Sequence, residues 1–305
     1  MDKRTVRLLI TTLVLGIAIG IKIDASGWRL EPPKLTRKTI SPTPAASSGT
    51  VVAAAEVLPA QTNLGVSWGD VIVKMVRGGA IDKQKFLKLY EGRQTDVEQV
   101  KQLLETPSDQ EIVVTAENAQ LILNLLWPMG IANKTAVLSD GPMGTQYKNE
   151  VGNFASTGGW TLGAKEGGKL FNSINLVTLT PEQEKLVTEI AGSIYRPCCG
   201  NSTYFPDCNH GAAMLGYIEM AVAAGLGKEQ IYKNALALNS YWFPQTYAEI
   251  ATYMKAKQNI AWKDVNPVEA LGVEYSSGQG AGKVNKELQT LGLVPKVQGG
   301  GGCGV

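Results

Sequence analysis

The chain has 305 residues, enough for one large domain or two of ordinary size, and 44% of them are apolar, as in a globular protein with a buried core. Its 29 basic and 27 acidic residues leave a net charge of +2, so it lacks the strongly basic surface typical of nucleic-acid binding. The composition therefore predicts a globular protein and excludes nucleic acid as a partner.

An apolar segment near the N-terminus predicts membrane attachment. Residues 8–21, LLITTLVLGIAIGI, carry no charge and follow three basic residues, a pattern typical of a signal peptide or an N-terminal anchor. These 14 residues are fewer than the roughly 17–25 of a usual span, but Lys22 can extend the segment by snorkelling. The cleavage signature around Ala25 is poor, which favours an uncleaved anchor. We therefore expect residues 1–25 to form a transmembrane helix that holds the body outside the cytoplasm.

Two further segments have the composition of flexible chain. Residues 26–62 are rich in Pro, Ser, Thr and Ala, which predicts a disordered linker between the anchor and a folded body at 63–296. Residues 297–305, VQGGGGCGV, contain four consecutive glycines that cannot pack, so we expect a flexible tail carrying Cys303.

The body is expected to be mainly helical. Apolar residues return at helical spacing from residue 64 onward, and Thr95 and Thr115 each precede a helical pattern as candidate N-caps. Thr180, Pro181 and Gln183 have the spacing of a capping box with proline at the first helical position. The remaining helical patterns cover 211–226, 228–243 and 244–258.

Short apolar runs at 111–115 and 175–180 predict small strands that are too short to define a large sheet. The expected fold class is therefore mainly α, with few short strands, an N-terminal transmembrane helix and a flexible C-terminal tail. A glycine-rich segment at 152–171, with Trp160 inside it, is a candidate lid or binding loop. It has no phosphate-binding motif, so nucleotide binding has no support in the sequence.

Soft metal ligands are concentrated in one short segment. Three of the four cysteines (Cys198, Cys199 and Cys208) and the sole histidine, His210, fall within 13 residues. Thiolates and imidazole suit tetrahedral zinc or copper(I), and Cys208 precedes a predicted helix whose N-terminus favours a thiolate. Adjacent cysteines are hard to direct at one ion, so Cys198 or Cys199 could instead face Cys303. The pattern predicts a zinc or copper(I) site made from these five residues.

Two other interpretations of the cysteines stay open. In an oxidising compartment they could form structural disulfides, Cys199 with Cys208 and Cys198 with Cys303, although this leaves the histidine unexplained. Alternatively, Cys198 and Cys199 could be a reactive pair, with His210 activating a thiolate and Cys303 exchanging disulfides, as in a thiol–disulfide oxidoreductase. Hydrolysis by a Cys–His pair has less support, because the sequence assigns no orienting third residue.

The residues around the cluster are given ordinary structural roles. Asp207 is expected to be the N-cap of the following helix rather than a hydrogen-bond partner of His210, and Arg196 to end the preceding helix. Met214, one turn after His210, could add a thioether ligand, but core packing is the simpler role.

Two features further along the chain also have ordinary structural explanations. Glu219 lies nine residues after His210, about 900° around the helix, and we expect it on the solvent-facing side. The aromatic run at 239–243 is expected to pack in the core.

These observations predict a membrane-tethered extracytoplasmic protein that binds a thiophilic ion and acts in metal transfer or sensing. The sequence does not decide whether the protein is an enzyme, and it identifies no protein partner.

Overall fold

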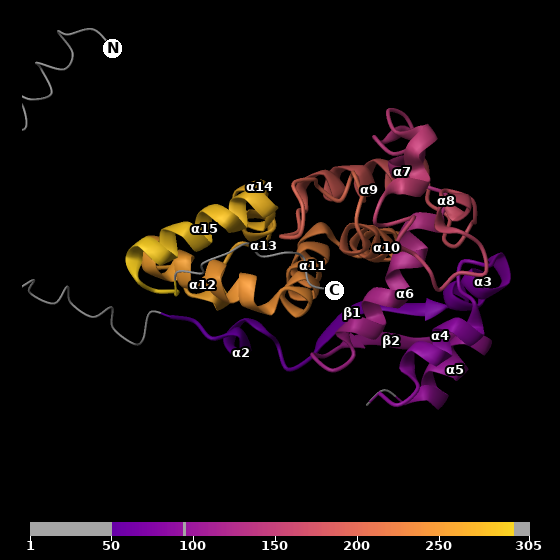
Figure 1. Cartoon of the computed structure of the whole chain (residues 1–305), viewed down its shortest axis with the longest axis horizontal. Helices are drawn as coiled ribbons and strands as arrows, with labels where there is room; N and C mark the ends of the chain where they lie inside the picture. Colours follow the sequence, from indigo (N-terminus) through magenta and orange to yellow (C-terminus); the bar gives the residue numbers. More distant parts are fainter. Residues whose placement is uncertain (1–50, 94–95, 296–305) are drawn as a thin grey trace, which may run out of the picture. The chain divides into compact units, whose positions relative to one another are not determined.

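The computed structural model describes residues 51–93 and 96–295, which form a mainly helical body with one small sheet (Figure 1). The predicted anchor at 1–25 and the tail with Cys303 lie outside the described residues. Within the described residues, no helix has the length and apolar character needed to cross a membrane. Residues 54–62, which the sequence assigned to the linker, include α2 (Ala54–Val57), which packs against α12 and buries Val57.

The sheet consists of β1 (Thr62–Gly69) and β2 (Ser108–Val114), which pair antiparallel. The strand predicted at 111–115 is therefore confirmed. The helical pattern predicted from residue 64 onward is wrong at its start, because residues 64–69 belong to β1. Leu64, Val66 and Trp68 are buried at alternating positions, the period of a strand with one face on the core. Residues 175–180 are irregular, so the strand predicted there is also wrong.

Three helices, α3 (Val71–Gly78), α4 (Lys83–Tyr90) and α5 (Val97–Glu105), lie between the two strands in the chain. Helix α3 contacts β1, and α5 contacts both α3 and α4. The carboxylate of Asp96 caps α5 by accepting from two backbone N–H groups, while Thr95 lies outside the described residues. The next helix, α6 (Ala119–Ala132), begins after Asn118 and not after Thr115, because a turn at 116–118 precedes it.

Short elements α7 (Ala136–Asp140), η1 (Lys148–Asn153) and α8 (Gly167–Leu170) lead to α9 (Pro181–Ser193). The predicted capping box of α9 is confirmed. Thr180 Oγ1 accepts from the Gln183 N–H at 3.2 Å, and Gln183 Oε1 accepts from the Thr180 N–H at 2.9 Å.

The central helix α10 (Asn209–Ala223) packs along α6 (Figure 1). Glycines allow this close approach, because a Cβ on Gly130 would lie 1.8 Å from the Ala212 carbonyl oxygen. From the side of α10, a Cβ on Gly216 would lie 2.6 Å from the Leu126 carbonyl oxygen of α6. The helix that carries His210 is thus held firmly in the main core.

The C-terminal part consists of the long helices α11 (Lys228–Trp242), α12 (Pro244–Gln258) and α15 (Gly278–Leu291), with η2 (Trp262–Asp264), α13 (Pro267–Ala270) and α14 (Val273–Ser276) between the last two. Helices α12, α13 and α15 enclose a second hydrophobic cluster. The cysteine-rich loop between α9 and α10 contacts this part, since Tyr195 N–H donates to Leu271 O and Gly278 N–H donates to Cys199 O.

Candidate metal centre

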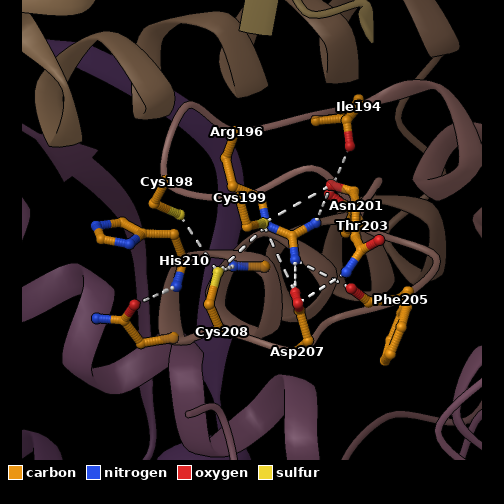
Figure 2. Close-up of polar contacts among 12 residues, drawn as sticks. Ile194, Arg196, Cys198, Cys199, Asn201, Thr203, Phe205, Asp207, Cys208 and His210 are labelled. Atoms are coloured by element: carbon orange, nitrogen blue, oxygen red, sulfur yellow. Dashed lines mark hydrogen bonds and ion pairs between the residues drawn. The ribbon is translucent and has the colours of Figure 1, made fainter. Parts of the chain in front are cut away.

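The three described cysteines and the histidine come from one loop and the first turn of α10 (Figure 2). The first half of the loop is closed by Thr203, whose N–H and Oγ1 both donate to the Ile194 carbonyl oxygen. Cys198 lies inside the closed segment and Cys208 follows it, and the Sγ atoms of these two residues are in contact.

One set of ligand atoms has the spacing of a metal site. The Sγ atoms of Cys198 and Cys208 lie 3.4 Å apart, and these atoms and a ring nitrogen of His210 all lie within 4.8 Å of one another. Two thiolates on one tetrahedral zinc ion, each bonded at ~2.3 Å, would be about 3.8 Å apart. The spacing of the two sulfurs is therefore close to that of two thiolates on one ion, and the three residues form a group that could hold one.

Cys199 belongs to an overlapping set with Asp207 and Cys208, whose ligand atoms also lie within 4.8 Å of one another. Its Sγ is 3.7 Å from Asp207 Oδ1, and its carbonyl oxygen accepts from Gly278 N–H at 2.7 Å. The four predicted ligands within this segment therefore divide into two groups that share Cys208. Whether Cys303 approaches either group lies outside the described residues.

His210 projects from the first turn of α10 against aromatic rings. Its ring centroid lies 4.4 Å from that of Phe243 and 5.7 Å from that of Trp242. Nδ1 is buried and has no hydrogen-bond partner in the described part of the chain. The aromatic run at 239–243 thus does more than fill the core: Tyr241 is buried, whereas Trp242 and Phe243 are half-buried and hold the imidazole.

Cys208 is the N-cap of α10, and its sulfur accepts hydrogen bonds from Gly211 N–H at 3.4 Å and from Arg196 Nε at 3.3 Å. Hydrogen bonds from Cys198 and Cys199, together with the charge of Arg196, lower the pKa of Cys208 well below its usual value despite burial. Cys208 is therefore the thiol best prepared to bind a metal as a thiolate.

The other two thiols are held in the protonated form. Hydrogen bonds to Cys199 and Cys208 and then burial raise the pKa of Cys198. For Cys199, the hydrogen bond from Cys198 favours the thiolate, but the bond to Cys208 and burial outweigh it and raise its pKa to about 12. A metal ion would supply the positive charge needed to deprotonate a second thiol, with release of a proton.

Arg196 and Asp207 have roles that the sequence analysis did not predict. Arg196 does not end the preceding helix, because α9 ends at Ser193. Its side chain is 1% exposed and forms an ion pair with Asp207, while its Nη1 and Nη2 donate to the Asn201 and Phe205 carbonyl oxygens at 2.7 and 3.0 Å. Figure 2 shows the guanidinium pointing into the loop toward Asp207 and Cys208. Asp207 is likewise not the N-cap, because Cys208 takes that position.

The sequence contains a signal for the ion pair between Arg196 and Asp207. Arg196 is the only basic residue among 195–209, and it stands beside three thiols and one carboxylate. Burial disfavours the charged form of Arg196, but the negative charges of Cys208 and Asp207 outweigh it and keep its pKa raised. A lone cation in such a segment is expected to pair with the anions around it.

Two residues later in α10 lie away from these ligand sets. Met214 is buried in the main core, consistent with packing. Glu219 is also fully buried, so the prediction that it faces solvent is wrong. Its Oε2 accepts from Asn133 Nδ2 at 3.0 Å, and burial raises its pKa well above the usual value. Because α10 is covered on all sides, it has no solvent-facing stripe at this position.

Comparison of the chain with protein families, with curated proteins and with solved structures gave no significant match.

Proposed function

We propose that this protein binds a thiophilic metal ion, zinc or copper(I), through Cys198, Cys208 and His210. The observation that carries the proposal is the grouping of two sulfurs and one imidazole nitrogen within 4.8 Å. These are the ligand types that zinc and copper(I) prefer, and the donor set contains no oxygen that would favour magnesium or calcium.

Three protein ligands would leave zinc with one open position, whereas copper(I) can be satisfied by three. An open or easily vacated position allows an incoming ligand to take or deliver the ion. This arrangement supports metal transfer or sensing as the role of the site.

The proposal also includes attachment to a membrane through residues 1–25, with the body on the extracytoplasmic side. It assigns Cys303 as an additional thiol that receives or delivers the ion. Both parts are supported by the sequence alone, through the apolar segment after the N-terminal basic residues and the glycine-rich residues before Cys303.

The experiment is a metal-affinity series with single cysteine-to-serine variants of the reduced full-length protein. Cys198→Ser and Cys208→Ser should each weaken zinc or copper(I) binding by at least tenfold, because each removes a ligand from the set of three. Cys199→Ser is the matched control and should weaken binding less than threefold. Equal losses from all three variants, or wild-type affinity in Cys208→Ser, would contradict the proposed ligand set.

A second function, thiol–disulfide exchange, is favoured by the 3.4 Å separation of the Cys198 and Cys208 sulfurs. Its reactive pair would be Cys198 and Cys208 rather than the adjacent cysteines, with the Cys208 thiolate as the attacking sulfur. The two thiols would reduce a substrate disulfide to two thiols and become a disulfide themselves. Mass spectrometry after treatment with a small disulfide should then find Cys198 linked to Cys208, reversible with dithiothreitol.

A further inference from the structure

The glycine-rich segment at 152–171 borders a hollow in the surface of the protein. Residues from α4, η1, the loop after it and α8 line a surface cavity of about 750 Å³. This volume lies within the range of small-molecule sites. None of the residues that line the cavity belongs to the proposed metal centre.

The lining is strongly cationic. It contains four lysines (Lys85, Lys148, Lys165 and Lys169) and one acidic residue, Glu166. Glu166 is already paired with Lys169 at 2.9 Å, and Lys85 Nζ donates to the Gly163 carbonyl oxygen at 2.8 Å. Within the described residues, Lys148 and Lys165 have no acidic partner within ion-pair distance, so their charges are available to a ligand.

The wall of the cavity is built from closely packed backbone. A Cβ on Gly167 would lie 2.0 Å from the Thr157 carbonyl oxygen, and one on Gly163 would lie 2.6 Å from the Lys165 carbonyl oxygen. Trp160 is buried beneath the loop and donates from Nε1 to the Ala80 carbonyl oxygen at 2.7 Å. These contacts fix the shape of the wall before any ligand arrives.

The backbone of the loop at Lys165 is also hydrogen-bonded to Gly79, the residue that follows α3. The N–H groups of Ala164 and Lys165 both donate to the Gly79 carbonyl oxygen at 3.1 Å. A Cβ on Gly79 would lie 3.2 Å from Lys165 Cγ, so the stem of this lysine passes over a glycine. Its ammonium group is therefore presented from an anchored backbone rather than from a loose loop.

We propose that this cavity, named here the lysine cavity and defined by Lys85, Lys148, Lys165 and Lys169, binds a small organic polyanion carrying phosphate or carboxylate groups. Lysine ammonium groups bind such oxyanions as point charges, and the unpaired Lys148 and Lys165 supply the strongest attraction. The cavity is larger than one such group, so the rest of the ligand would lie against the glycine-lined wall.

The test is calorimetric titration of the full-length protein, stripped of metal, with pyrophosphate and separately with citrate as probes of the charged end. Removing metal first prevents chelation from contributing heat. We expect at least one probe to bind, and the double variant Lys148→Ala/Lys165→Ala to weaken that binding at least tenfold. Preference for pyrophosphate or citrate distinguishes a phosphate ligand from a carboxylate ligand.

The matched control is Lys185→Ala/Lys286→Ala, which removes the same charge from exposed lysines on α9 and α15. This control should bind the probe within twofold of the wild type, and circular dichroism should show that both double variants are folded. Failure of both probes to bind, or equal weakening in the two double variants, would overturn the proposal.

Discussion

Gly211 is the residue on which the geometry of the proposed metal centre depends most directly. It gives the N–H that Cys208 accepts, and its missing side chain leaves space for the buried guanidinium of Arg196. A Cβ there would lie 2.6 Å from Arg196 Cζ. Arg196 in turn holds Cys208 and Asp207 in place, so one small residue supports the whole loop.

Gly211→Ala should therefore destabilise the protein, because the added methyl group displaces a buried cation from its partners. We expect the free energy of unfolding to fall by about 1–3 kcal/mol, the range for overpacked interiors. Urea unfolding monitored by circular dichroism measures this change. Gly192→Ala on α9 is the control: its Cβ meets no atom within 4 Å, and the variant should gain up to about 1 kcal/mol. Wild-type stability in Gly211→Ala would show that Arg196 is not constrained there.

Single residues also mark where sequence reasoning succeeded and failed. The capping box at Thr180 was predictable because its three residues interact locally. Arg196 and Asp207 were assigned to helix ends by local rules, but their positions are set by a closed loop and three thiols. Whether Cys198, Cys199 and Cys208 hold a metal, form disulfides or exchange them stays a prediction from the residue types.

At the scale of elements, the contact between α6 and α10 fixes the start of α10, where His210 lies. Close helix packing of this kind needs small residues at the crossing, and here Gly130 approaches the backbone of α10 at Ala212. Both helices were predictable from the sequence, but their packing against each other was not. The packing depends on the three-dimensional arrangement of two segments that begin about 90 residues apart. The strand β1 was missed for a related reason, since its alternation is short and runs directly into α3.

Gly130→Ala should be more harmful than an ordinary glycine replacement, because its Cβ would collide with rigid backbone. We expect a loss of about 3 kcal/mol in the free energy of unfolding, at the upper end for overpacked cores. Differential scanning calorimetry should show a clear fall in melting temperature. Gly282→Ala on α15, where a Cβ meets nothing within 4 Å, should melt at or above the wild-type temperature. A Gly130→Ala protein that melts like the wild type would mean that α6 and α10 can separate without cost.

For the whole molecule, Glu219 links stability to pH. Burial raises its pKa well above the ordinary 4.5. The unfolded chain releases this proton near pH 4.5, whereas the folded protein retains it to higher pH. The unfolded state therefore binds fewer protons, and the contribution of Glu219 to stability falls as the pH rises above about 4.5.

Glu219→Gln should accordingly stabilise the protein more at pH 7 than at pH 4, because glutamine has no charge to bury. Urea unfolding of wild type and variant at both pH values measures the difference. Glu229→Gln, at an exposed position on α11, should show little difference between the two pH values. Equal destabilisation of Glu219→Gln at pH 4 and pH 7 would contradict a buried, proton-retaining carboxyl group.

The central claim is that Cys198, Cys208 and His210 share one thiophilic ion. Metal content by mass spectrometry, with a thiol count on the same sample, tests it most directly on protein purified without oxygen or chelator. The account predicts about one equivalent of zinc or copper in the wild type and loss of that metal in His210→Ala, with the thiol count unchanged. Absence of metal from the wild type, with a Cys198–Cys208 disulfide in its place, would contradict the claim and favour thiol–disulfide exchange.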